Sequence, residues 1–256
     1  AHAQAPAASP SLGAAGFSEP PPGRPPPPEI AARGFILHDL GSQQTLAVRQ
    51  PDQAVPPASL TKLMTAYLVY QAVDAGQLRL EDTLPVSERA WQAAIGSGAR
   101  ALAAAGARLT VAELLQGMAV LGANDAAVAL AEGVAGSVDD FVARMNRQAQ
   151  VFGLKATQFR NPDGRAVSGQ ASTPRELAWI AVRLLTDFPQ ALTHYRQPAL
   201  TLGGVRHAST NLLLLRDPSV DGLQVAYADR LGYAMAATSR RPVGGSERRL
   251  VALVVG

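Results

Sequence analysis

Strand-like segments lie at both ends of the chain, and helical patterns fill the middle. Residues 34–39 and 44–49 read as two strands joined by a turn at Gly41-Ser42. Further strand-like segments near the other end cover residues 199–202, 222–226, 232–238 and 249–254. Strands, then helices, then strands again are typical of an α+β fold. We therefore predict an antiparallel sheet that is formed from both chain ends and flanked by helices, with a helical subdomain inserted at roughly residues 85–195.

The helical middle carries recognisable start signals. Thr110 and Glu113 form a capping box that opens a helix to about residue 120. Asn124-Asp125 opens an Ala-rich helix to about residue 134, and Ser137 starts another to about residue 152. Thr173-Pro174-Arg175-Glu176 combines a Thr cap, Pro at the first helical position and Glu at the third, which predicts a helix to about residue 186.

The two ends of the chain have special compositions. Residues 1–30 are mainly Ala, Pro, Ser and Gly, which predicts a disordered linker before a single domain at 31–256. The first residues resemble the small-residue end of a processed signal peptide, so we expect export to the periplasm or cell envelope. The chain ends inside the apolar strand 250–256, which indicates truncation. No apolar run of about 18 residues predicts a membrane helix, so membrane association would need parts outside this chain.

Composition argues against several kinds of site. The chain has no cysteine, which rules out disulfides and thiol chemistry. Its four histidines show no ligand spacing, so we expect no metal and no cofactor. The net charge is only +3 and no basic block stands out, so we expect no nucleic-acid partner. His38 lies in the first strand beside a turn, and we expect it to face outward rather than act in catalysis.

Ser59 and Lys62 are the main local candidates for catalysis. Apolar residues at positions 60, 63, 64, 67 and 68 predict an amphipathic helix that starts near Ser59. Side chains three residues apart share a helix face, so the Lys62 ammonium group can reach the Ser59 hydroxyl. A nearby amine can take the hydroxyl proton and make the serine a nucleophile. The alternative is that Ser59 is only the N-cap of its helix.

Several segments of the chain carry a family resemblance. They cover residues 57–65, 106–115, 124–131, 157–161, 169–173 and 220–223. Together they resemble the low-molecular-mass penicillin-binding proteins, the serine D-alanyl-D-alanine carboxypeptidases, whose fold is similar to that of serine β-lactamases. The resemblance runs from about Gly34 to the end of the chain.

Two of that family's three site motifs are altered here. The motifs are Ser-x-x-Lys, Ser-x-Asn and Lys-Thr-Gly. Ser59-x-x-Lys62 is whole. The second position reads Gly122-Ala123-Asn124, which keeps the asparagine and lacks the serine. The third reads Gln224-Val225-Ala226, in which all three residues are replaced.

The resemblance implies a reaction and a substrate. Ser59 would attack the terminal peptide bond of a peptidoglycan pentapeptide ending in D-Ala-D-Ala, and Lys62 would take its proton. Asn124 would orient Lys62, and the backbone N–H groups of Ser59 and Tyr227 would form the oxyanion hole. β-Lactams are the expected inhibitors of such a site.

The altered motif positions imply weaker activity. A serine at the position of Gly122 would relay a proton, and a lysine at the position of Gln224 would supply positive charge for the substrate carboxylate. A hydroxyl at the position of Val225 would bind the same carboxylate. Losing such contacts weakens transition-state stabilisation enough to lower the reaction rate by about 10³–10⁵-fold. Arg206 and Arg230 are the cations that could replace the lysine.

Three functions stay open on the sequence. The first is a D-Ala-D-Ala carboxypeptidase whose activity is weak or lost. The second is a non-catalytic relative that binds peptidoglycan or a protein partner on the same fold. The third is a related acyl-serine esterase or β-lactamase-like hydrolase. Under the non-catalytic alternative, Lys62 would only bond to Asn124, or Asn124 would only cap its own helix.

Overall fold

The main sheet combines strands from both ends of the chain. The computed structural model describes residues 16–18, 20, 22–23, 26–27, 29–97, 101–229 and 231–256. Within these residues the strand order is β2-β1-β10-β9-β7, and β8 also pairs with β9. The strands are β1 (Gly34–Asp39), β2 (Gln44–Arg49), β7 (Val220–Gly222), β8 (Val225–Ala228), β9 (Gly232–Val243) and β10 (Ser246–Val255). The predicted α+β fold, with its antiparallel sheet formed from both chain ends, is confirmed.

β10 occupies the middle of this sheet. It pairs antiparallel with β1, from Gly34 opposite Val255 to Asp39 opposite Leu250. Its other edge pairs with β9 along its whole length. Because β10 lies between two strands, one face of its apolar C-terminal half is buried: Val251, Leu253 and Val255 are all 0% exposed.

Two strand predictions need correction. The segment expected as one strand at 222–226 is divided into β7 and β8, because the pairing with β9 is irregular around Gly222. The strand expected to end at residue 238 continues as β9 to Val243. It then turns at Gly244 and Gly245, whose positive φ angles of 59° and 80° suit glycine.

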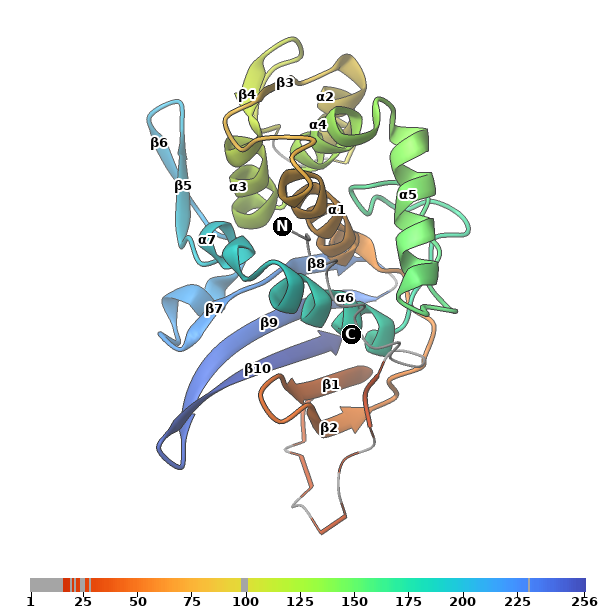
Figure 1. The fold of residues 1–256 in the computed structure, drawn as a ribbon, viewed down its shortest axis with the longest axis vertical. Helices are drawn as coiled ribbons and strands as arrows, with labels where there is room; N and C mark the ends of the chain where they lie inside the picture. The colour runs from red at the N-terminus through yellow and green to blue at the C-terminus, as the bar shows by residue number, and fades with distance from the viewer. Residues whose placement is uncertain are drawn as a thin grey trace, which may run out of the picture.

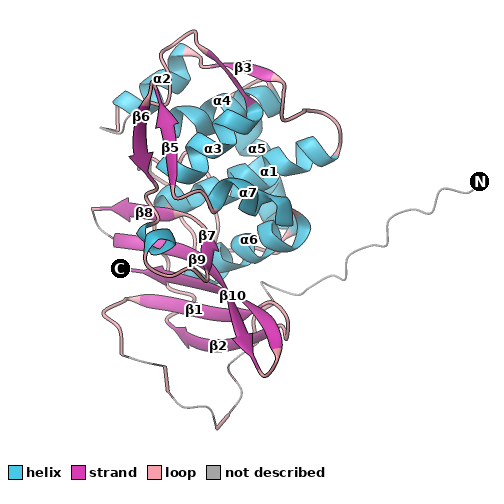
Figure 2. Cartoon of the chain, turned by 90° about the vertical axis from the view of Figure 1, so that its left-hand side faces the viewer, coloured by secondary structure: helices cyan, strands magenta, loops and turns pink. Residues whose placement is uncertain are grey.

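Helices cover the sheet and form a layer beyond it (Figure 1). They are α1 (Lys62–Asp74), α2 (Glu88–Ile95), α3 (Val111–Leu121), α4 (Asn124–Ala135), α5 (Val138–Val151), α6 (Pro174–Asp187) and α7 (Leu192–Tyr195). Short 3-10 turns are η1 (Ala58–Thr61), η2 (Pro189–Ala191) and η3 (Leu212–Leu215). α6 packs on β1 and β10, and the helices α2 to α5 gather with α1 on the side away from β2 (Figures 1 and 2). Two small two-stranded sheets complete the fold: β3 (Thr83–Pro85) pairs with β4 (Arg108–Thr110) across the segment that contains α2, and β5 (Ala199–Leu202) forms a hairpin with β6 (Val205–Ala208).

The helix starts follow the capping signals of the sequence. Thr110 and Glu113 form the expected capping box. The hydroxyl groups of Ser137 and Thr173 accept backbone N–H groups at the starts of α5 and α6. α2 was not expected, although Ser87 caps it by accepting the N–H of Ala90.

α1 is a central helix rather than a surface one. Every residue from Lys62 to Tyr70 is buried, so the predicted amphipathic pattern describes only part of the helix surface. Leu60, Leu63 and Met64 are all 0% exposed within the hydrophobic core. The core therefore holds the Ser59–Lys62 segment from several sides.

The outward position expected for His38 is wrong. Its side chain is 0% exposed, and its ring lies 4.7 Å from the ring of Phe17, which in turn packs edge-on against Trp179. His38 shares the inner sheet face with Ile36, two residues earlier, and α6 covers this face. Burial lowers the pKa of His38, which favours a neutral imidazole in this apolar setting.

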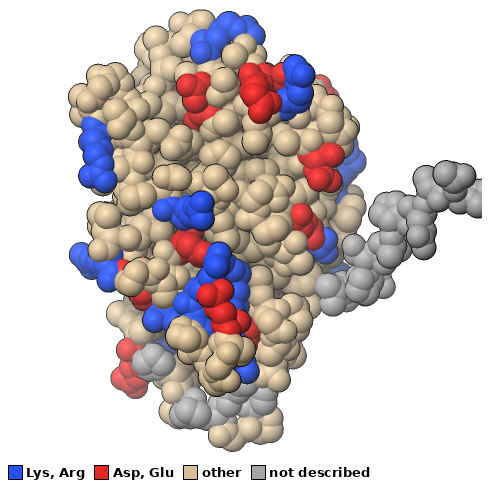
Figure 3. Space-filling view, turned by 60° about the vertical axis from the view of Figure 1, so that its left-hand side comes forward, with Lys and Arg blue, Asp and Glu red and all other residues tan. Residues whose placement is uncertain are grey.

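Charged groups of opposite sign alternate on the visible surface. Figure 3 shows basic and acidic side chains intermixed on one face. The β9–β10 hairpin contributes ion pairs between Arg240 and Glu247 and between Arg241 and Asp217. No helix in the described part of the chain has both the length and the apolar character needed to span a bilayer.

Candidate active site

Ser59 lies in the 3-10 turn η1, one turn before Lys62 opens α1. Thr61 is the N-cap residue of α1, and neither this helix nor η1 has a side-chain cap. The alternative of Ser59 as an N-cap is therefore wrong. Its hydroxyl instead accepts a hydrogen bond from Lys62 Nζ at 3.2 Å, as the i, i+3 spacing predicts.

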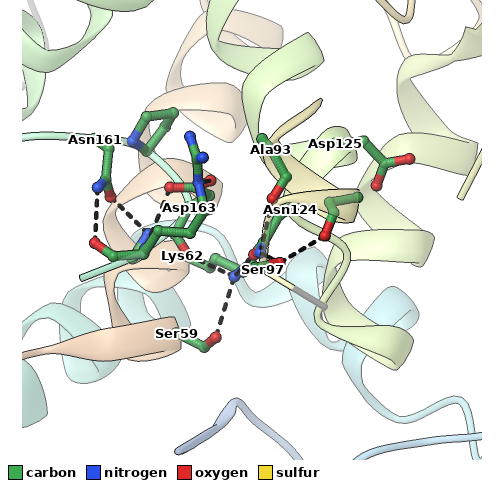
Figure 4. A network of polar contacts seen from close by, with 12 residues as sticks. Ser59, Lys62, Ala93, Ser97, Asn124, Asp125, Asn161 and Asp163 are labelled. Atoms are coloured by element: carbon green, nitrogen blue, oxygen red, sulfur yellow. Dashed lines mark hydrogen bonds and ion pairs between the residues drawn. The ribbon is translucent and has the colours of Figure 1, made fainter. Parts of the chain in front are cut away.

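Lys62 is the centre of the polar cluster (Figure 4). It is 0% exposed. Besides Ser59, its ammonium group donates to Asn124 Oδ1 at 2.7 Å and to the backbone carbonyl of Asp163 at 2.5 Å. These acceptors match the three N–H donors of an ammonium group.

Burial changes the proton affinity of Lys62. Desolvation lowers its pKa to about 8, the nearby charge of Asp163 opposes that effect, and Arg165 adds to it. A pKa near 8 leaves roughly a tenth of the lysine neutral at pH 7, far more than for an ordinary lysine. The neutral amine can take the Ser59 proton, so the geometry and the charge state both suit a general base.

Asn124 is the first residue of α4, but its side chain does not cap that helix. Ala123 is the N-cap residue, and no side-chain cap is present. The Asn124 amide instead joins two elements: Oδ1 accepts from Lys62, and Nδ2 donates to Ser97 Oγ at 2.9 Å. The alternative of Asn124 as a simple cap is therefore wrong, and its side chain instead accepts a hydrogen bond from Lys62.

Ser97 joins the cluster although no motif in the sequence indicates it. It follows α2 in a stretch of small residues, and its side chain is exposed. Its hydroxyl accepts from the Asn124 amide and donates to the carbonyl of Ala94 at 2.7 Å. No local pattern reports this contact, because it depends on how α2 packs against α4.

The turn at residues 161–165 closes the cluster on the other side. Asn161 Oδ1 accepts the backbone N–H of Gly164 at 2.7 Å, which fixes the turn. The carboxylate of Asp163 is buried and pairs with Arg165 Nε at 2.5 Å. The sequence identifies this turn but not its role, since Asp163 contacts Lys62 through a backbone atom.

Gly164 is required for this turn to lie against the nucleophile. It has a φ of +83°, and a Cβ atom there would lie in the space of the Ala58 carbonyl oxygen, 1.9 Å away. Gly164→Ala is therefore expected to lower the free energy of unfolding by about 3 kcal/mol, from backbone strain plus the clash. Urea unfolding measures this change.

Gly76→Ala is the matched control for Gly164→Ala. Gly76 also has a positive φ, +68°, but nothing lies within 4 Å of the position that a Cβ atom would take. It should lose only the strain of about 1–2 kcal/mol. Equal losses at both positions would contradict the close approach of Gly164 to Ala58.

The two altered motif positions face each other. Gly122 ends α3 with a left-handed conformation, φ 68° and ψ 26°. A Cβ atom on Gly122 would lie 3.7 Å from Gln224 Nε2. Gln224 is 0% exposed, and its Oε1 has no hydrogen-bond partner among the described residues. Gly122 is thus both the position of the missing serine and a helix C-cap.

Tyr227 lies on the free edge of β8. Ala236 N–H donates to the carbonyl of Gln224, so residue 224 directs its carbonyl toward β9. Backbone groups alternate along a strand, which directs the N–H of Tyr227 to the opposite edge. Among the described strands β8 pairs only with β9, and β8 packs against η1, which carries Ser59.

Of the two cations considered as replacements for the motif lysine, the structure describes only Arg206, which is not part of this cluster of contacts. Arg206 lies on β6, in the small hairpin with β5. Arg230 lies outside the described residues. The cation that does adjoin Lys62 is Arg165, which no sequence motif indicates. In the described part of the chain, no group of three or more His, Cys, Asp or Glu side chains could hold a metal ion.

Comparisons with known proteins agree with this architecture. Residues 22–256 match the family described as D-alanyl-D-alanine carboxypeptidase. D-alanyl-D-alanine carboxypeptidase DacA of Haemophilus influenzae is 34% identical over 231 residues, which cover 90% of this chain and 58% of that relative. The chain thus spans little more than half the length of this relative.

Solved structures are similar in fold. Penicillin binding protein 6B of Escherichia coli superposes with a TM-score of 0.84 at 34% identity, covering 94% of this chain and 76% of that one. Penicillin-Binding Protein D2 of Listeria monocytogenes, solved in an ampicillin-bound form, gives a TM-score of 0.76 at 30% identity, covering 90% of this chain and 91% of that one. The family match and these relatives confirm the resemblance seen in the sequence, and the chain belongs to the D-alanyl-D-alanine carboxypeptidase family.

Proposed function

We propose that this protein is a serine-type D-Ala-D-Ala carboxypeptidase that acts on peptidoglycan stem peptides through an acyl-Ser59 intermediate. The observation that carries the proposal is the contact between Lys62 Nζ and Ser59 Oγ at 3.2 Å, made by a lysine whose pKa is lowered by burial to about 8. A serine hydroxyl becomes a useful nucleophile when such a base adjoins it.

The reaction proceeds in two stages. Neutral Lys62 takes the Ser59 proton as Oγ attacks the carbonyl carbon of the penultimate D-Ala. The peptide C–N bond then breaks, the leaving D-Ala amine takes the proton that Lys62 had received, and the acyl group stays on Ser59. Water attacks the ester in the second stage, which releases the shortened peptide and restores the Ser59 hydroxyl.

Backbone groups stabilise the oxyanion in this proposal. The N–H of Ser59 and the N–H of Tyr227 are the two donors, and the free edge of β8 beside η1 supports the second assignment. Because these donors belong to the backbone, the replacements at Gln224 and Val225 leave them in place. Asn124 contributes by holding the Lys62 ammonium group.

Turnover is expected to be slow. Gln224 is neutral and buried, and Gly122 has no hydroxyl, so neither supplies the charge or the proton relay of the complete motifs. These same positions favour the second candidate function, a non-catalytic relative that binds peptidoglycan peptides. We place either function outside the cytoplasm, where assembled peptidoglycan carries these stem peptides.

Covalent labelling of Ser59 tests the proposal. The protein is incubated with a labelled penicillin, and intact and peptide mass spectrometry locate the added mass. We expect one adduct on Ser59 in the unaltered protein and none in Ser59→Ala, because Ser59 is the hydroxyl in contact with Lys62 among the described residues. Ser246→Ala, an exposed serine in the β9–β10 hairpin, is the control and should label normally.

The absence of any adduct at millimolar drug on folded protein would overturn the catalytic proposal and leave the binding function. If the adduct forms, release of D-Ala from a pentapeptide identifies a carboxypeptidase. Hydrolysis of the drug without D-Ala release identifies the third candidate, another acyl-serine hydrolase.

A further inference from the structure

The described cluster contains a positive charge beside Lys62 that does not come from the third motif. The Asp163 carbonyl accepts the Lys62 ammonium group, and the Asp163 carboxylate pairs with Arg165 Nε at 2.5 Å. The Asp163 side chain is 0% exposed, whereas that of Arg165 is 40% exposed. Lys62, Asp163 and Arg165 therefore form a chain of contacts from the core to the surface.

We propose that Arg165 is a positioning residue that offsets the Asp163 carboxylate beside Lys62, so that Lys62 can lose its proton although position 224 carries no cation. The proposal rests on the carboxypeptidase function, because it explains how the base remains usable with Gln224 in the third motif. It concerns Lys62 only; the substrate carboxylate gains nothing from it.

The sign of the effect follows from the charges around Lys62. Asp163 and Asp125 both favour its protonated form, and Arg165 opposes them. From α4, Asn124 is neutral, and the Asp125 carboxylate is occupied by the backbone N–H groups of Leu102, Ala103 and Ala126. Gln224 is also neutral. Among the described residues, Arg165 is therefore the one cation that lowers the proton affinity of Lys62.

The guanidinium group is not needed to build the turn. Asn161 accepts the Gly164 N–H at 2.7 Å and donates to the Arg165 carbonyl at 2.9 Å. Gln170 Oε1 accepts the backbone N–H of Arg160 at 2.8 Å. All these bonds use backbone atoms of the turn, so they persist when the Arg165 side chain is replaced. Arg165→Leu should therefore change the charge at Lys62 with little change in structure.

The lysine content of the chain permits a direct measurement. Lys62 and Lys155 are its only lysines, so protein labelled with ¹³C at lysine Cε gives two resonances, and Lys155→Arg assigns them. We expect the Lys62 titration midpoint to rise by about one pH unit in Arg165→Leu, since Asp163 then acts unopposed. Lys155 serves as the internal reference and should not move.

A double replacement separates charge from structure. Asp163→Asn alone should lower the Lys62 midpoint, and Asp163→Asn with Arg165→Leu should return it toward the original value, because both charges are then absent. Arg89→Leu, which removes an exposed ion pair with Asp139 elsewhere, is the control and should leave the midpoint unchanged. The pH dependence of Ser59 acylation should shift with the midpoint in each variant.

The outcomes are distinct for the two proposals. An unchanged Lys62 midpoint in Arg165→Leu, together with equal midpoints in Asp163→Asn and in the double variant, overturns the role of Arg165, even if Ser59 is acylated. A raised midpoint in Arg165→Leu, reversed in the double variant, supports that role even if no acylation occurs, in which case only the carboxypeptidase function fails. If Arg165→Leu does not fold, the double variant compared with Asp163→Asn decides in the same way.

Discussion

Combining Gly122→Ser with Gln224→Lys is expected to raise the rate of Ser59 acylation by a labelled penicillin by about 10³-fold. Each change restores a hydrogen bond involving a charged group, which contributes about 1.5–3 kcal/mol. Two such bonds amount to about 4 kcal/mol in the transition state, and each 1.36 kcal/mol is a factor of ten. Stopped-flow or quenched labelling gives the second-order rate constant.

The two replacements should act together rather than independently. A Cβ atom on Gly122 would lie 3.7 Å from Gln224 Nε2, so the new hydroxyl and the new ammonium group can bond to each other. Gln224→Lys alone would bury a second cation near Lys62 without that partner. Gly122→Ser alone would introduce a left-handed serine, which costs about 1 kcal/mol of stability.

Rate constants for the four proteins form a double-mutant cycle that measures the coupling between the two positions. We expect the double variant to exceed the product of the two single effects. Strictly multiplicative effects would show that the two positions do not interact. No gain in the double variant would show that the altered motifs do not limit acylation.

Lys62→Met is expected to reduce Ser59 acylation by about 10³–10⁴-fold, because it removes the only base in contact with the nucleophile among the described side chains.

The Lys62→Met replacement should also make the folded protein more stable at neutral pH. Lys62 has a folded-state pKa of about 8 against 10.5 for an ordinary lysine, so below pH 8 its charge opposes folding by about 3 kcal/mol. A methionine of similar length removes that opposition while it loses the three hydrogen bonds.

The pH dependence gives the sharper test. A group whose pKa is lowered by folding binds fewer protons in the folded state between pH 8 and 10.5, so the stability of the unaltered protein relative to Lys62→Met should rise over that interval. Urea unfolding at several pH values measures the difference in the free energy of unfolding between the two proteins. Both proteins contain the same buried tyrosines, so the titration of these tyrosines cancels in that difference. Lys155→Met, at an exposed lysine, is the control for replacing a lysine that is not buried. A constant difference between Lys62→Met and the unaltered protein across this range would contradict the lowered pKa.

Local spacing predicted part of the site well. The contact between Ser59 and Lys62 follows from three residues along one turn, and the starts of α3, α5 and α6 follow from caps that act within a few residues. The α+β class follows from strands at both ends of the chain. Each of these predictions depends on interactions between near neighbours or on the order of elements.

The parts that the sequence did not predict depend on tertiary contacts. Ser97 and Asp163 reach the Asn124–Lys62 pair because α2 and the turn at 161–165 pack there, which no local pattern reports. His38 was expected outside, but it lies on the strand face that α6 covers. Gly122 was read only as a missing serine, whereas its left-handed conformation also ends α3.

The central place of β10 has a consequence for how the molecule is made. β1 leaves the ribosome well before β10. The two strands pair along one edge of β1, although more than 200 residues separate Gly34 from its partner Val255 in the sequence. Contacts of such long sequence separation slow folding, and an unpaired strand edge is open to wrong partners until the right one arrives. The edge of β8 that we propose for oxyanion binding also follows the helical layer in the chain. Synthesis must therefore pass β8 before the Ser59 segment meets the strand that packs against it and that would complete the proposed site.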